Sequence, residues 1–392
     1  MLAVEGGHAN IVKILLDKGA DVSIVTDDER FTALHFCAKS GNAAIAKMLV
    51  SAGANLVAVS STTGSTPLHI ASEEGHVETM TVLIEAGASL NYRTPEGETP
   101  LYTSCGNDQV AAVRVLLRAK ADPLLASTDP LGQTFLPLDI AVFRGHSGVV
   151  RELLQQLGAE GCGGASGGVH ALQIAAQGGE LGMMAALTGA GVVDTGEALV
   201  DAAGYGGEAS VKFLLQRWWQ RRQLSADSSR GDAYVNARDN TGRTPLISGI
   251  LLCRPCSPRI VRMLVDAGAD AVSAVRLATP EEVPFFHGTP LNFVKLYADQ
   301  KREDDASEET LNIVEGVRRL LLRVVAVHAV SWLWHSSSDT PAASRAAADI
   351  ARTRTASAMI STPLTRMLPI LRRRANRRGV VLASLFRCST KP

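Results

Sequence analysis

Apolar residues recur in pairs of short stripes along the chain, and the same polar and glycine positions bound each pair. In one such unit Thr66 precedes Pro67, an apolar stripe follows at helical spacing, and Gly75 ends it. Threonine caps the start of a helix, proline is tolerated at the first helical position, and glycine accepts the left-handed conformation that ends a helix. A second stripe at 82–84 runs to Gly87. The pattern predicts two short antiparallel helices per unit.

The unit repeats. Thr-Ala-Leu-His stands at 32–35, Thr-Pro-Leu-His at 66–69 and Thr-Pro-Leu-Tyr at 99–102, so that the leucines at 34, 68 and 101 are 34 and 33 positions apart. A second marker is in phase: Gly-Ala-Asp at 19–21, Gly-Ala-Asn at 53–55, Gly-Ala-Ser at 87–89 and Lys-Ala-Asp at 120–122, with Lys120 in the glycine position. A single helix pair cannot bury its own apolar stripes, so the units are expected to stack and to be stabilised by their interfaces.

These marks resemble the ankyrin repeat, a unit of about 33 residues with a Thr-Pro-Leu-His-x-Ala signature. The resemblance extends over residues 1–325 as about nine units. It implies an all-α fold, an ankyrin-repeat α-solenoid of stacked helix-turn-helix units with β-turn or hairpin fingers. It also implies that His35 and His69, in the fourth signature position, bond neighbouring turns and are structural. We expect a truncated first unit, because the chain begins within its first helix, and degenerate sixth to ninth units.

Three segments interrupt the period, near 216–234, 251–258 and 297–309, and each is expected to loop off the stack. The first contains Trp218 and Trp219 followed by Arg221 and Arg222, a combination enriched in binding hot spots, although packing of one tryptophan against its own unit explains it as well. The last expected unit ends near residue 325, and the period is lost after the serines at 336–338. Residues 326–340, with two further tryptophans, are expected to cap the last unit.

Charged residues are distributed unevenly along the chain. The whole chain has 39 Lys+Arg and 39 Asp+Glu, yet residues 341–392 carry eleven basic residues and one acid, Asp349, so an excess of negative charge lies in the first 340. We expect 341–392 to be a poorly ordered basic tail. A solvated tail, a nuclear-import signal, a patch for nucleic acid or anionic membrane at 366–391, and a segment that folds back on the repeats all remain open.

The sequence contains no complete motif for catalysis or for binding a cofactor or metal. The glycine-rich stretch at 161–168 lacks the Gly-Lys-Ser/Thr ending of a phosphate loop and is expected to be a flexible connector between units. Cys253 and Cys256 have metal-ligand spacing, but a structural zinc needs four ligands and no second pair lies nearby. The apolar run at 324–334 is shorter than the roughly 20 residues that span a membrane. We therefore expect no enzyme, no cofactor, no metal site and a cytoplasmic or nuclear location.

The resemblance implies a partner site on the tips of the turns and on the exposed side of the first helices. At the turn tips these positions are Asp28, Glu29, Phe31, Thr62, Thr63, Ser65, Pro95, Glu96, Glu98, Pro130, Leu131 and Gln133. On the helices they are Lys39, Ser40, Glu73, Glu74, Phe143 and Arg144. Acids outnumber bases in this set, which predicts a partner with a basic segment. An ordinary solvated surface would show the same excess.

The expected function is noncovalent protein binding, as a monomeric scaffold or adaptor that uses the concave face of the array. A second hypothesis makes the chain a targeting or regulatory subunit, or a fragment, of a larger enzyme or channel assembly whose effector function lies outside the repeats. The fold alone does not distinguish between them, because many partners use the same scaffold.

Overall fold

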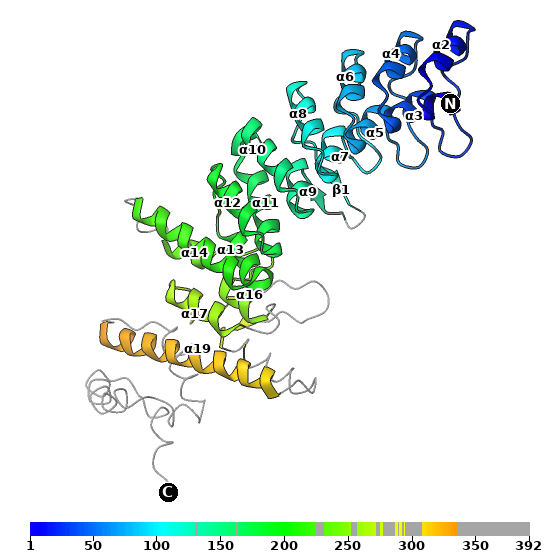
Figure 1. The fold of residues 1–392 in the computed structure, drawn as a ribbon. Helices are drawn as coiled ribbons and strands as arrows, with labels where there is room; N and C mark the ends of the chain where they lie inside the picture. The colour runs from blue at the N-terminus through cyan, green and yellow to red at the C-terminus, as the bar shows by residue number, and fades with distance from the viewer. Residues whose placement is uncertain are drawn as a thin grey trace. The chain divides into compact units, whose positions relative to one another are not determined.

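The computed structural model describes residues 1–129, 132–161, 164–224, 231–251, 257–271, 275–276, 287–288, 290–291, 294 and 308–335 (Figure 1). The chain forms two compact units, Met1–Asp194 and Thr195–Pro392.

The first unit is a double row of helices. Its elements are α1 (Leu2–Glu5), α2 (Ala9–Asp17), α3 (Ala33–Ser40), α4 (Ala43–Ser51), α5 (Pro67–Glu74), α6 (Val77–Glu85), α7 (Pro100–Gly106), α8 (Val110–Arg118), β1 (Ser127–Thr128), β2 (Thr134–Phe135), α9 (Pro137–Phe143), α10 (Ser147–Gly161), α11 (Gly164–Gly178) and α12 (Leu181–Gly189). Each first helix, from α3 to α11, packs on the first helix of the next pair, and each second helix, from α4 to α12, does the same (Figure 1). The predicted stack of helix pairs is confirmed here.

The helix boundaries follow from the signature residues. Thr66 and His69 form a capping box at the start of α5, Pro67 occupies the first helical position, and Gly75 ends the helix with φ 74°. Thr32 and His35 cap α3 in the same way. These side chains satisfy the backbone N–H groups that the first turn of a helix leaves unpaired.

The core is formed by the same repeat positions in successive pairs. The signature leucines Leu34, Leu68, Leu101, Leu138 and Leu172 are all buried, and so are the small residues Ala71 and Ala141 that follow them in their helices. Small side chains between the leucines let neighbouring first helices approach closely. The periodic sequence thus builds one continuous core from short helices that could not be stable alone.

The connections between pairs are short fingers. Three of them close with a backbone hydrogen bond between their two ends: Thr26 N donates to Phe31 O at 2.9 Å, Ser60 N to Ser65 O at 3.0 Å and Thr94 N to Glu98 O at 3.0 Å. In the fourth, β1 and β2 form an antiparallel hairpin that pairs Ser127 with Phe135 and Thr128 with Thr134. Adjacent fingers are also joined, for example by Thr128 N donating to Glu96 O at 3.0 Å.

The second unit contains α13 (Glu197–Asp201), a π-helical turn η1 (Ala202–Gly206), α14 (Gly207–Leu224), α15 (Gly231–Val235), α16 (Pro245–Leu251), α17 (Pro258–Asp266), β3 (Val275–Arg276), β4 (His287–Gly288) and α19 (Glu308–His335). Helix α14 packs on η1 and α17, α16 packs on α17, and α17 packs on α19. β3 and β4 pair antiparallel, Val275 with Gly288 and Arg276 with His287.

Two segments differ from expectation. Residues 216–224 continue α14 and residues 231–235 form α15, so the first predicted insert is helical over most of its described length and does not simply loop off the stack. Its glutamines and arginines have good helix propensity. Residues 164–168 of the glycine-rich stretch lie in α11, not in a connector. At Gly168 an added Cβ would lie 2.7 Å from Val192 Cγ2, so close packing explains that glycine.

The remaining boundaries fall partly outside the described residues. Residues 326–335 of the expected capping segment continue α19, whereas 336–340 lie outside. Residues 252–256 of the second insert, 297–307 of the third and the basic tail 341–392 also lie outside the described residues.

Candidate partner-binding surface

The turn tips and first helices of the N-terminal unit enclose a cleft of about 580 Å³. We call it the acidic cleft. Its lining includes many of the residues predicted from the sequence: Glu29, Phe31, Lys39, Thr62, Thr63, Ser65, Glu73, Glu74, Glu98 and Arg144. These residues come from α3, α5, the C-terminal cap of α9 and the fingers that precede α3, α5 and α7. The repeat therefore brings residues more than 100 positions apart to one surface.

Other predicted residues lie outside this lining. Asp28, Ser40, Pro95, Glu96, Gln133 and Phe143 are exposed but do not line the cleft. The ring of Phe143 lies 5.9 Å from that of Phe135, centroid to centroid, on the β2 side of α9. Pro130 and Leu131 lie outside the described residues.

The sequence prediction missed lining residues from one unit in particular. Tyr102, Thr103, Gly106 and Asn107 belong to α7 or its end, and they line the cleft together with Ile70 and Ile140. The glycine that ends the first helix of other units is replaced here by Asp108, which has φ 57°. Asp108 is the seventh residue after the signature leucine, as Gly41 and Gly75 are in their units, so a strict count from the leucine would have found these positions.

Glu73 and Glu74 stand in the last turn of α5, immediately before Gly75. The C-terminal end of a helix carries partial negative charge, so carboxylates there are unfavourable by a few tenths of a kcal/mol to about 1 kcal/mol each. The last turn of α5 contains no basic residue that would offset this. Helix stability therefore does not explain why two acids occupy these positions.

The cleft carries an excess of negative charge. Its lining contains four glutamates, Glu29, Glu73, Glu74 and Glu98, and two basic residues, Lys39 and Arg144. The pKa of Glu98 is raised, first by burial and then by the negative charges of Glu96 and Glu73, while Arg144 acts in the opposite direction. Burial also raises the pKa of Tyr102. A cation placed between these carboxylates would relieve their mutual repulsion.

Inter-repeat hydrogen bonds hold the edge of the cleft in place. The residue that precedes α6, α8 or α10 reaches back to the end of the preceding unit's first helix: His76 Nε2 lies 3.1 Å from Lys39 O, Gln109 Nε2 donates to Glu73 O at 3.1 Å, and His146 Nε2 lies 3.0 Å from Gly106 O. The three carbonyls belong to residues that line the cleft. Because the backbone there is tied to the next unit, the cleft is preorganised.

The signature histidines have the structural role expected of them. His35 Nε2 lies 3.2 Å from Ser65 O and His69 Nε2 lies 3.2 Å from Glu98 O, and in each the Nδ1 atom contacts the capping threonine. In the fifth pair Asp139 takes this position. Its Oδ2 atom accepts from Leu136 N at 2.9 Å and lies 2.9 Å from His170 Nδ1 on α11.

Within the described residues no three His, Cys, Asp or Glu side chains come together as potential metal ligands. Cys253 and Cys256 lie outside the described residues. Across the helices that the structure describes, none combines the length and the apolar character needed to cross a membrane.

Comparison with known proteins identifies the repeat. The family model described as ankyrin repeats (3 copies) matches residues 1–94 and 54–127. A search of curated proteins found no match. Ankyrin repeats are in general protein-interaction modules, and the matched residues supply all of the acidic cleft except Ile140 and Arg144. The chain therefore carries ankyrin repeats in residues 1–127, and its mostly helical fold fits an all-α repeat solenoid.

Proposed function

We propose that this protein is a scaffold or adaptor that binds a protein partner through the acidic cleft, without catalysing a reaction. One observation supports the proposal above all: ten residues that hold equivalent positions in separate repeats line one preorganised cleft. A cleft built from several turns spreads contacts over a length of chain, which suits a polypeptide ligand.

The partner's contact segment carries Arg or Lys. Carboxylates at Glu29, Glu73, Glu74 and Glu98 surround the cleft, and they supply acceptors that match guanidinium and ammonium groups. Apolar and aromatic surface from Phe31, Ile70, Tyr102 and Ile140 lies in the same lining and can cover the aliphatic stems of such side chains. The proposal is thus a basic segment with long side chains, held by charge at its tips and by packing along its stems.

The test compares two double variants that each remove two negative charges. Glu73→Gln with Glu74→Gln changes the cleft, whereas Glu78→Gln with Glu85→Gln changes exposed residues of the neighbouring helix α6. Proteins captured from native lysate by the wild-type chain are identified by mass spectrometry, and their affinities for the three forms are measured. We expect the cleft variant to bind its partner about tenfold or more weakly, and the α6 variant to bind as the wild type does.

Circular dichroism and thermal unfolding must first show that the variants are folded. If both variants bind the captured proteins as tightly as the wild type, the acidic cleft is not the binding surface and the proposal is wrong. If the cleft variant alone loses binding but the partner's contact segment is acidic or neutral, the adaptor function stands and the basic-segment proposal does not.

A further inference from the structure

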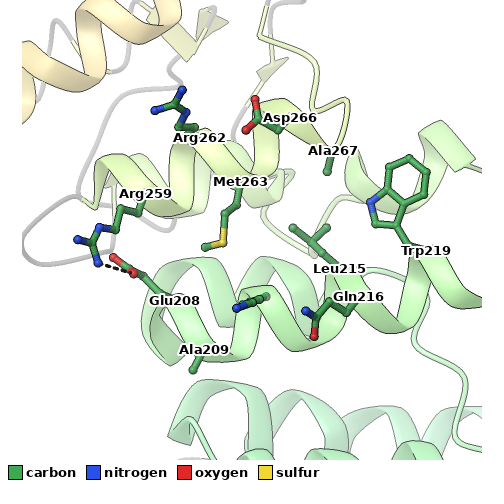
Figure 2. Close-up of a pocket in the computed structure, with 11 residues that line it drawn as sticks. Glu208, Ala209, Leu215, Gln216, Trp219, Arg259, Arg262, Met263, Asp266 and Ala267 are labelled. Atoms are coloured by element: carbon green, nitrogen blue, oxygen red, sulfur yellow. Dashed lines mark ion pairs between the residues drawn. The ribbon is translucent and has the colours of Figure 1, made fainter.

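A second hollow lies in the C-terminal unit, between α14 and α17 (Figure 2). It has a volume of about 750 Å³, and we call it the α14–α17 groove. Its lining residues on α14 recur at helical spacing from Glu208 to Trp219, and those on α17 recur from Arg259 to Ala267. Both helices thus present one continuous stripe to the groove. At 1.5 Å per residue the stripes are about 12 to 16 Å long, equal to two or three turns of a helix.

The groove has an apolar floor and one aromatic end. Leu215 of α14 and Met263 of α17 lie on facing sides, and Trp219 stands at one end (Figure 2). Trp219 is 44% exposed, although tryptophan is usually well buried in folded proteins. An exposed Trp beside a Met and a Leu has the composition of a binding hot spot.

The length of α14 creates this end of the groove. Helices α12 and α17 contain 9 residues each, whereas α14 contains 18. Its extension is held by an aromatic cluster: the Trp218 ring stacks on Tyr234 of α15 at 5.7 Å, and the Arg222 guanidinium lies 5.6 Å from the centre of the Trp219 ring. Of the two tryptophans, Trp218 is used for packing and Trp219 is left for the surface. The extension is therefore rigid, which reduces the entropy lost on binding.

The rim of the groove is basic. Glu208 pairs with Arg259 at 3.5 Å at the end opposite Trp219 (Figure 2). Lys212 and Arg262 are exposed and form no ion pair within the described residues, and the lining as a whole holds three basic residues, Lys212, Arg259 and Arg262, against two acids, Glu208 and Asp266. A ligand with carboxylates along its flanks would complement the rim.

The walls of the groove decide the conformation of the ligand. Both walls are helices whose backbone groups are already paired, so they offer no strand edge to an extended peptide. An extended segment lying on this apolar floor would bury N–H and C=O groups without partners, which is unfavourable by about 1 to 3 kcal/mol for each. A helix satisfies its own backbone groups and can lay an apolar face between two helices.

We propose that the α14–α17 groove binds an amphipathic helix of a protein partner, with apolar residues toward Leu215 and Met263 and acidic residues along its flanks. This site is separate from the acidic cleft, lies in the other compact unit, and selects the opposite charge. The protein then has two binding surfaces of complementary chemistry, one for a basic segment and one for an acidic helix.

A display library tests the proposal. It presents three turns of helix on a stable helical hairpin, with Leu, Ile, Phe, Met or Ala at the apolar positions and Glu or Lys in equal proportion at the flanks. Selection on the full-length chain is compared with selection on Lys212→Glu with Arg262→Glu, and on a matched control, Lys13→Glu with Lys18→Glu, which reverses two exposed charges of the other unit. We expect Glu-flanked helices to be enriched on the wild type and the control.

The dissociation constants of enriched helices should rise about tenfold or more with Lys212→Glu and Arg262→Glu, and by a similar factor with Trp219→Ala. A proline in the second turn should abolish binding, because it breaks the helix. The proposal is overturned if no helix is enriched over the groove variant, if Lys-flanked helices are preferred, or if the proline peptide binds as well. The double variant Glu73→Gln with Glu74→Gln changes only the acidic cleft and must bind the enriched helices as the wild type does. The groove proposal and the acidic-cleft proposal can therefore fail independently.

Discussion

At the scale of single residues, the signature histidine links the start of one helix to the next finger. His69 is buried, with Nδ1 2.8 Å from the Thr66 hydroxyl oxygen and Nε2 3.2 Å from Glu98 O. Burial lowers its pKa from 6.5 to about 4, against the opposing effect of the hydrogen bonds to Glu98 and Tyr92. His69 is therefore neutral in the folded chain near pH 6. Burial also lowers the pKa of His35.

A pH prediction follows from the depressed pKa of His69. Below pH 6.5 the unfolded chain takes up a proton that folded His69 does not bind until about pH 4, so the contribution of this residue to stability is complete above pH 6.5 and is lost toward pH 4. The loss is about 3 kcal/mol from the shift of the pKa. Urea unfolding at pH 7 and pH 4.5 should show it.

The His69→Gln variant serves as the control for this pH effect. It is expected to be less stable than the wild type at pH 7, because the bridging hydrogen bonds are lost, but to lose less stability on acidification. An equal loss for wild type and variant would mean that carboxylates or other histidines cause the acid sensitivity.

At the scale of elements, the left-handed position that ends each second helix is the most regular mark after the signature. Gly19, Gly53 and Gly87 occupy it with φ 81°, 83° and 92°. Lys120 holds the same position after α8 with φ 72°. A residue with a Cβ is strained in this conformation by roughly 1–2 kcal/mol, whereas glycine is not.

We predict that Lys120→Gly raises the free energy of unfolding by about 1 kcal/mol, because it removes this strain at an exposed position. Lys47→Gly, in the middle of α4 and also exposed, should lower it by about 1 kcal/mol, because glycine has poor helix propensity. Chemical denaturation of the wild type and the two variants measures both changes in the free energy of unfolding. A loss of stability in Lys120→Gly would show that the lysine side chain makes contacts that outweigh the strain.

At the scale of the whole molecule, zero net charge hides two surfaces of opposite sign. The chain has 39 basic and 39 acidic residues, yet acids exceed bases in the lining of the acidic cleft, by four glutamates to Lys39 and Arg144, and bases exceed acids in the α14–α17 groove, by Lys212, Arg259 and Arg262 to Glu208 and Asp266. Association with charged partners therefore depends on local potential and not on net charge.

This distribution predicts a salt dependence for the wild-type chain. The affinity of a captured basic partner should fall about tenfold as NaCl rises from about 50 mM to about 500 mM, because salt screens exposed charges over a few ångströms. Titrations at several salt concentrations, with the Glu73→Gln and Glu74→Gln variant as the reference, measure the slope. The slope should be smaller in that variant. An affinity that does not change with salt would show that packing alone holds the partner.

Much of the N-terminal unit could be predicted because its determinants are local or periodic. Thr66, Pro67 and Gly75 set the bounds of α5 through capping and backbone conformation, which depend on near neighbours in sequence. Periodicity then places equivalent residues on one face of a stack, so Glu29, Glu73 and Glu98 could be assigned to one surface without coordinates. The failure at Tyr102 and Asn107 arose where Asp108 replaces the glycine that marks the position.

The sequence by itself determined the repeat, the capping of its helices and most of the acidic cleft. Only the tertiary structure decided that α14 continues to Leu224, that residues 164–168 are helical, and that a groove lies between α14 and α17. These features depend on contacts between residues distant in sequence, such as Trp218 with Tyr234 and Gly168 with Val192. Such contacts stabilise conformations that local propensity leaves open, and the repeat pattern there is too eroded to indicate them.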